Sequence, residues 1–156
     1  MTDVLDTRSC RILAVSSPGS RLAELCVIAN GFGNAEVHFA TSGSARRWGI
    51  ASERFVGIVD FSLFQLWRMP VCAVQLAIAF IRLRPRVVIS TGAAPGALAL
   101  MLGRLTGARC IWVESLTSTD ELSLSGRLAG RIAHLWLTQW EHLAREDGPY
   151  YHGGTL

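Results

Sequence analysis

The sequence predicts an α/β domain built on an open, mostly parallel sheet. Short runs rich in β-branched residues alternate along the chain with longer segments of helical periodicity, the pattern of βαβ units. The 156 residues favour one domain, spanning 1–156. Half of the residues are hydrophobic and 17% are charged, enough apolar material for a sizeable core. The predicted fold class is therefore a single Rossmann-like domain.

The first half of the chain contains two strand-and-helix units. Val37 and Phe39 alternate with polar residues, as in a strand, whereas Leu22 and Leu25 share one face of a helix. Ser20 is a candidate N-cap for that helix, with Glu24 completing a capping box. We expect, in order, a strand at 11–16, a turn at 17–20, a helix at 21–29, a strand at 35–40, a polar loop at 41–49 and a weaker extended stretch at 55–59.

The second half begins with a long apolar segment and continues the alternation. We expect a strand at 87–90, a helix at 95–105, a strand at 109–114, a polar loop at 115–121, a helix at 122–134, a short strand at 135–138 and a final helical turn or two at 140–145. Gly, Pro and Tyr residues close the chain. We expect residues 1–10 and 148–156 to be irregular tails.

Composition excludes several chemistries. The net charge is +3, too mild to indicate a nucleic-acid partner. All 15 basic residues are arginine, so neither a P-loop lysine nor a Schiff-base lysine is available. The four cysteines show no C-x-x-C spacing, which argues against a zinc site and fits a reducing, cytoplasmic environment. Residues 1–6 do not have the pattern of a signal peptide. We expect no metal and no cofactor.

Ligands of open parallel sheets bind beyond the carboxyl ends of the strands, so the loops after strands are the candidate sites. After the first strand, "SSPGSR" has one glycine and lacks the G-x-G-x-x-G fingerprint. Ser17, Ser20 and Arg21 either face a ligand there or belong to a capped helix. In "STGAAPG", Ser90 to Gly96 form either a ligand-facing loop or a tight turn. Glu114 is either a general base or a charged residue that caps the next loop.

The apolar segment from Phe61 to Ile81 contains one charge, Arg68. An arginine in the middle of a membrane costs about 2.5–3.5 kcal/mol, so a spanning helix is disfavoured. Two alternatives remain open: a crossover helix buried on the sheet, and a helix inserted into one leaflet. The arginines at positions 82, 84 and 86 would then meet anionic headgroups.

Two stretches resemble a known family: "RPRVVISTGAAPGALALMLGRLTGARCIWVES" and "LSLSGRLAGRIAHLWLTQWEHL". They are similar to the membrane-associated, acceptor-side subunit of the two-chain N-acetylglucosaminyltransferase of lipid-linked oligosaccharide synthesis. Bacterial relatives of that subunit serve exopolysaccharide synthesis. The resemblance extends from Arg11 to the tail and is densest from Pro85 to Leu143.

The resemblance implies the N-terminal half of a split GT-B glycosyltransferase, acting without a metal at the cytoplasmic face of the membrane. A partner chain supplies the half that binds the UDP-sugar, UDP-GlcNAc above all, in a heterodimer. This chain binds a polyprenyl-linked sugar acceptor and contacts the membrane through Phe61–Arg84. The family's first loop reads G-S-G-G-H, and Arg21 stands here where the histidine is expected. Because an arginine stays protonated, it cannot act as a general base.

The resemblance and the strand-end loops together define candidate residues. Glu114 is the candidate catalytic base, and Gln139, Trp140 and Glu141 are partner-binding or structural. Candidate acceptor-binding residues are Ser17, Gly19, Ser20, Arg21, Ser90, Thr91, Gly92, Ala93 and Ser115. The absence of the histidine, and of an arginine in 116–119, supports an alternative function: a non-catalytic scaffold that docks a partner to the membrane.

Overall fold

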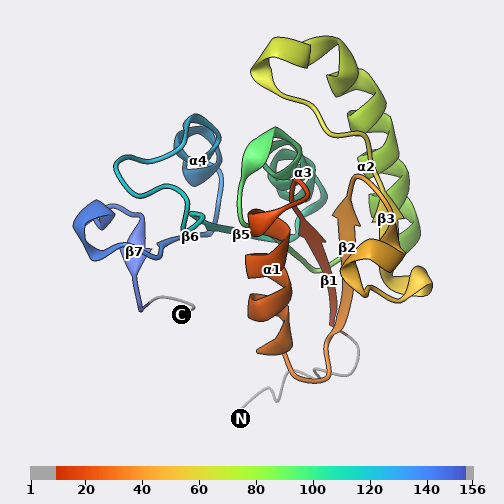
Figure 1. The fold of residues 1–156 in the computed structure, drawn as a ribbon, viewed down its shortest axis with the longest axis horizontal. Coiled ribbons are helices and arrows are strands. Elements are labelled where there is room, and N and C mark those ends of the chain that lie inside the picture. The colour runs from red at the N-terminus through yellow and green to blue at the C-terminus, as the bar shows by residue number, and fades with distance from the viewer. Residues whose placement is uncertain (1–9, 154–156) are drawn as a thin grey trace.

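A computed structural model describes residues 10–153 of the chain. Seven strands form one sheet in the order β3-β2-β1-β4-β5-β6-β7 (Figure 1). Every neighbouring pair is parallel, which confirms the predicted sheet. The strands are β1 (Arg11–Val15), β2 (Glu36–Thr41), β3 (Phe55–Gly57), β4 (Val87–Ser90), β5 (Arg109–Val113), β6 (Leu135–Thr138) and β7 (Tyr150–Tyr151).

Helices cover the two faces of this sheet unequally. Leu13 and Val15 of β1 pack in a core with α2, α3 and α4, whereas Ile12 and Ala14 pack with Leu25 of α1. Alternate residues of a strand point to opposite faces, so α1 lies on one face and the other three helices on the other. The α-helices are α1 (Ser20–Asn30), α2 (Met69–Leu83), α3 (Ala93–Thr106) and α4 (Leu124–Gly130). Short 3-10 helices are η2 (Ala45–Trp48), η3 (Ser52–Arg54), η4 (Leu63–Arg68) and η5 (Glu141–Leu143).

The chain reverses its direction of travel across the sheet at β1. β2 and β3 lie on one side of β1, and α2 then carries the chain back to β4 on the other side. The loops after β1 and β4 therefore diverge at the carboxyl edge, where open α/β sheets bind their ligands. The "SSPGSR" and "STGAAPG" loops thus start at adjacent strands and then turn toward opposite faces of the sheet, where α1 and α3 lie.

Four details differ from the sequence-based expectations. The N-cap of α1 is Gly19 rather than Ser20, so the helix has no side-chain cap, and Glu24 lies one residue too far from Ser20 for a capping box. The helix α3 begins at Ala93, two residues before Pro95. The helix α4 ends at Gly130, because His134 already donates its backbone N–H to Cys110 at the start of the β6 pairing.

The fourth difference concerns the C-terminal tail, which we expected to be irregular from residue 148. Tyr150 and Tyr151 form strand β7, because β6 offers an unpaired edge and Leu137 is in register with Tyr150. The N-terminal tail at 1–9 and the last three residues lie outside the described part of the chain.

Candidate functional site

A groove of about 470 Å³ opens at the carboxyl edge of the sheet. Its walls come from the loop after β1, the start of α3, the segment from Asp60 to Arg68 and the start of α4. Three of the predicted acceptor-binding residues line it: Ser17, Arg21 and Ala93. The groove is therefore assembled from four segments that are distant in sequence.

Arg21 is the central cation of this groove. Its side chain lies directly over Gly92, where a Cβ atom would stand only 2.9 Å from the arginine Nε. Gly92 has a φ of 143°, and the Thr91 hydroxyl donates to the Arg21 carbonyl over 2.7 Å. The Nε of Arg21 is buried and has no hydrogen-bond partner among the described residues. Because the Arg21 side chain lines the groove, its positive charge favours an anionic ligand there.

Ser90 and Thr91 do not line the groove, contrary to the prediction that they contact a ligand. Both are fully buried. The Ser90 hydroxyl accepts from the Gly92 N–H over 3.2 Å, and Gly96 packs against it so closely that any Cβ there would overlap the oxygen. The two hydroxyls therefore shape the loop from below, and Ala93 and Ala94 present its outer side to the groove.

Glu114, the predicted general base, is buried beneath α4 with 1% of its surface exposed. Its Oε1 accepts from the Trp112 indole over 3.1 Å, and its Oε2 accepts from the Ser123 hydroxyl over 3.1 Å. Burial raises the pKa of this carboxyl, and the hydrogen bonds from Trp112 and Ser123 lower it in part. Glu114 does not line the groove, but Ser123 does. This geometry is that of a group that positions α4.

Ser115 is also turned away from the groove, into a buried polar network centred on Glu24. Its hydroxyl donates to Glu24 Oε1 over 3.0 Å, and the backbone N–H of Leu116 donates to the same carboxylate. The Gln139 side-chain amide donates to Glu24 Oε2 and to the Glu114 carbonyl, each over 3.2 Å. The local sequence pattern predicted a capping box for Glu24 and could not predict this network. Ser115 and Gln139 are separated from Glu24 by 91 and 115 positions in the chain.

The "QWE" stretch fixes the loop after β5 from the opposite side. The Trp140 indole donates to the Leu116 carbonyl over 3.1 Å, and His142 contacts the Thr119 carbonyl. These hydrogen bonds within the chain favour the structural alternative for Gln139 and Trp140. Glu141 is exposed and begins η5.

The remaining predicted residues and several unpredicted ones complete the edge. Gly19 lines a neighbouring cleft of about 320 Å³ beside Trp48, and Ser20 starts α1 next to it. Sequence reasoning did not place Asp60, Arg68 or Ser123 at the groove. Asp60 accepts a hydrogen bond from the Ser17 hydroxyl over 2.8 Å. The isolated charge of Arg68 in an apolar segment was the one available signal.

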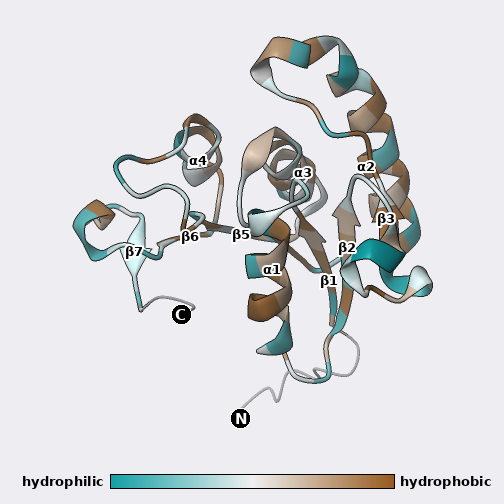
Figure 2. Cartoon of the chain, viewed as in Figure 1, coloured by the Kyte–Doolittle hydropathy of each residue, from teal (hydrophilic) through white to brown (hydrophobic). Residues whose placement is uncertain are grey.

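Exposed apolar side chains follow η4 and α2 from the groove. Figure 2 colours several stretches of these two helices as hydrophobic. Phe64, itself a lining residue, is 97% exposed, and Trp67 is 72% exposed. Further exposed residues follow at helical spacing: Met69, Val71, Val74, Ile78 and Ile81. The segment Phe64–Leu83 is long and apolar enough to cross a membrane by length and composition, and only 22% of its most apolar window is buried. Cys72, Leu76 and Phe80 nevertheless anchor α2 in the core.

Metal ligands are not gathered at this edge. Within residues 10–153, no group of three or more His, Cys, Asp or Glu side chains is arranged to hold a metal ion. The polar side chains that line the groove carry two guanidinium groups, one carboxylate, one amide and several hydroxyls.

The sequence from residue 59 to residue 155 matches the family described as "Oligosaccharide biosynthesis protein Alg14 like". The match covers well over half of the chain. The chain belongs to the Alg14-like family. This confirms the resemblance found in the sequence, and it includes Asp60, Arg68, Glu114 and the "QWE" stretch within the matched region.

Among curated proteins, the Alg14-like chain is 37% identical over 86 residues to the UDP-N-acetylglucosamine transferase subunit ALG14 of Candida albicans. The matched part is 51% of this chain and 39% of the relative, so the two align over less than half of the relative's length.

Solved structures confirm the fold of the Alg14-like chain. MurG of Acinetobacter baumannii superposes with a TM-score of 0.70 at 9% identity, over 93% of this chain and 45% of MurG. The UDP-GlcNAc 2-epimerase of Neisseria meningitidis, bound to UDP-GlcNAc, superposes with a TM-score of 0.64 at 12% identity, over 85% of this chain and 41% of the epimerase. The predicted Rossmann-like, GT-B-type fold is confirmed, and at these identities the likeness concerns the fold alone.

Proposed function

We propose that this chain is the acceptor-side subunit of a two-chain UDP-sugar transferase, with UDP-GlcNAc as the donor. It binds a polyprenyl-pyrophosphate-linked sugar at the cytoplasmic face of the membrane and recruits a partner subunit that binds the donor. One observation carries the proposal: the groove with Arg21 and Arg68 opens directly beside the exposed apolar surface of η4 and α2. An acceptor with an apolar chain and an anionic linker needs both.

The family supports this proposal, because the Candida albicans relative is named as a UDP-N-acetylglucosamine transferase subunit. The fold is in keeping with it, since this chain superposes on 45% of MurG, and in the proposal a second polypeptide supplies the donor-binding part. The groove would then be one wall of the active site, and the partner's donor-binding domain the other.

Within the groove, the two arginines would bind the pyrophosphate of the acceptor. Arg21 lines the groove, and charge-assisted hydrogen bonds from a guanidinium to phosphate are strong. Arg68 lies on η4 with its guanidinium 5.1 Å from the Trp67 ring, at the junction between the groove and the apolar surface. The apolar chain of the acceptor would leave the groove past Phe64 into the bilayer.

Asp60 is the carboxylate best placed to act as the general base. It lines the groove, and Ser17 donates to its Oδ1, which leaves Oδ2 free of any hydrogen bond to a described residue. In the proposed reaction, the acceptor hydroxyl oxygen attacks C1 of the UDP-sugar, the bond from C1 to the UDP oxygen breaks, and the hydroxyl proton passes to Asp60. Glu114 would hold Ser123 and α4 in place rather than take this proton.

The reconstituted pair tests the proposal. We expect co-expression with the product of the adjacent open reading frame to give a complex that transfers GlcNAc from UDP-GlcNAc to a polyprenyl-pyrophosphate sugar in vesicles. Arg21→Ala should raise the KM for the acceptor at least 10-fold, since a charged hydrogen bond contributes about 1.5–3 kcal/mol. Arg46→Ala, an exposed arginine of η2 away from the groove, is the matched control. Full activity of the isolated chain would refute the split enzyme.

The scaffold function remains the second candidate, and the arginine at position 21 is the observation that favours it. If the partner supplies every reacting group, this chain only docks it to the membrane. Arg21→Ala and Asp60→Asn would then both leave the turnover of the reconstituted pair unchanged.

Membrane binding through η4 is a separate prediction. Phe64→Ser combined with Trp67→Ser should lower partitioning onto phosphatidylglycerol vesicles by at least 10-fold, because burying one such side chain contributes about 1.5–3 kcal/mol. Val27→Ser with Leu105→Ser removes two exposed apolar side chains from α1 and α3 and is the control. Cosedimentation with vesicles measures the effect. Equal binding by both double variants would exclude η4 as the contact.

A further inference from the structure

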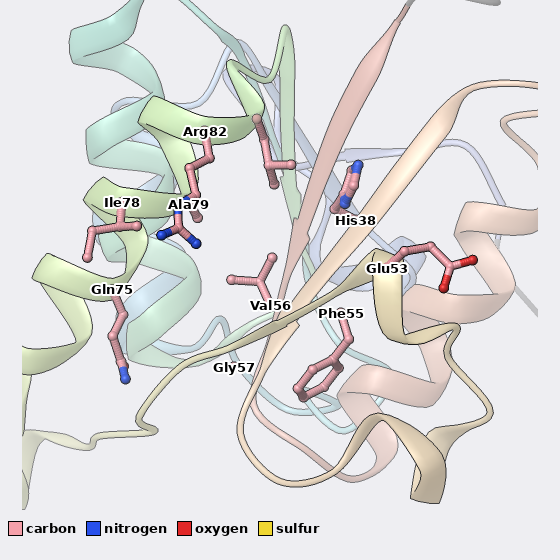
Figure 3. A pocket seen from close by; sticks show the side chains of 10 residues that line it. His38, Glu53, Phe55, Val56, Gly57, Gln75, Ile78, Ala79 and Arg82 are labelled. Carbon is pink, nitrogen blue, oxygen red and sulfur yellow. The ribbon is translucent and has the colours of Figure 1, made fainter.

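A second cavity, of about 360 Å³, lies between α2 and the β2–β3 edge of the sheet (Figure 3). One wall is the flank of α2 that carries Gln75, Ile78 and Arg82, and the other wall is β3 with Phe55 and Val56. None of its lining residues lines the groove at the carboxyl edge. The proposed transferase function leaves this cavity without a role.

Arg82 is the unusual group in this cavity. Figure 3 shows its side chain running along α2 so that the guanidinium lies beside Ala79 and faces Val56. Among the described residues, Arg82 has neither a hydrogen bond nor an ion pair. Arg82 is exposed to solvent, so its guanidinium is accessible at the mouth of the cavity, where it can form charge-assisted hydrogen bonds with an anion.

The acidic groups nearby do not supply this counter-charge. Glu53 lines the cavity, but Figure 3 shows its carboxylate turned away from Arg82. Glu36 is already engaged with His38, whose Nε2 lies 2.7 Å from its Oε1, and Arg11 lies 3.9 Å from its other oxygen. The cavity thus combines one unpaired cation with walls of Val56, Ile78, Ala79 and Leu83. This is the chemistry of a site for an amphiphile with an anionic head.

The position of the cavity indicates where such an amphiphile comes from. Ile78 is 43% exposed and lies in the apolar stripe of α2 with Val74 and Ile81. The same residue forms part of the cavity wall. If α2 rests on the bilayer, as the proposed function requires, the cavity opens at the level of the lipid headgroups and upper acyl chains.

We propose that the α2–β3 cavity binds an anionic phospholipid of the membrane, with its phosphate on Arg82 and an acyl chain along Val56, Ile78 and Ala79. This site is separate from the acceptor groove. It rests on the proposed function only for the source of the lipid. Bound lipid would fix α2 at a defined depth and orient the acceptor groove toward the bilayer.

Binding of a monomeric short-chain lipid tests the site without a membrane and without the transferase partner. Dioctanoyl phosphatidylglycerol, below its critical micelle concentration, is titrated into the full chain by calorimetry. We expect binding at least 10-fold tighter than that of dioctanoyl phosphatidylcholine. Arg82→Gln should weaken phosphatidylglycerol binding about 10-fold, and Arg86→Gln, which changes an exposed arginine outside the cavity, should leave it within twofold. Val56→Phe fills the cavity and should abolish binding.

Three results would overturn this inference: equal binding of the two lipids, unchanged binding by both Arg82→Gln and Val56→Phe, or displacement of phosphatidylglycerol by farnesyl phosphate at much lower concentration. The last result would assign the cavity to the acceptor lipid. Thermal unfolding shows whether each variant is folded. The calorimetric titration does not measure transfer activity. A negative titration therefore leaves the transferase proposal intact, and a negative transfer assay leaves the lipid site intact.

Discussion

Replacing Gly126 by alanine is expected to destabilise the domain by about 2–3 kcal/mol, the typical cost of forcing extra atoms into a packed interior. A Cβ at this position would overlap Glu114 Oε1 and would stand 2.8 Å from the Ser123 hydroxyl oxygen. Neither neighbour can move freely, because Glu114 is held by Trp112 and Ser123, and the Ser123 oxygen also accepts from the Gly126 N–H over 2.9 Å. Urea unfolding measures the loss.

A matched glycine in the sheet provides the control for this prediction. Gly57 lies in β3, where an added Cβ would meet its nearest neighbour, the Phe55 ring, at an ordinary 3.7 Å. Gly57→Ala should therefore change the free energy of unfolding by less than about 0.5 kcal/mol, as at permissive surface sites. Equal effects of the two substitutions would mean that α4 can move away from Glu114, and that the carboxylate does not fix its position.

The strand and helix periodicity predicted most of the strands and helices along the chain, because these follow from local patterns. The long segment at 61–84 was harder. It contains so few polar residues that a helix buried on the sheet and a helix lying on a membrane have the same sequence pattern. Only the packing of Cys72, Leu76 and Phe80 against the sheet shows which face is buried, and the exposure of Trp67 and Ile81 shows which face is free.

The sequence predicted where the candidate residues lie on the sheet, but not which way their side chains point. Ser17, Arg21 and Ala93, which follow strand ends, do line one groove. Strand-end position could not separate Glu114 from Asp60, because both follow apolar stretches and both are acids. Glu114 is turned under α4, and the side chain that completes the groove, Asp60, comes from a connection with no regular structure. Tertiary packing, which no local pattern encodes, decides between them.

The exchange of each acid for its amide in the reconstituted transferase separates the two roles. Asp60→Asn should lower kcat by about 10²–10⁴-fold, the usual contribution of a general base. Glu114→Gln should keep kcat within about threefold, because the amide oxygen can still accept from Trp112 and the amide nitrogen can donate to Ser123. Initial rates at saturating UDP-GlcNAc and acceptor provide the measurement. A large loss of kcat in Glu114→Gln alone would return the base to Glu114.

Stability measurements show whether the amide variants remain folded and test the environment of Glu114 at the same time. Burial raises the pKa of this carboxyl, so the folded state binds its proton more tightly than the unfolded state does. The stability that this group contributes is then lost as pH rises from its ordinary pKa through the raised value. The Glu114→Gln variant has no such proton, so at neutral pH it should be at least as stable as the parent chain. As the pH falls, the free energy of unfolding of the parent should rise relative to that of the variant. If Glu114 weakens the fold when it is ionised, and the Gln variant both folds and turns over, then Glu114 holds α4 in place and exchanges no proton with the substrate.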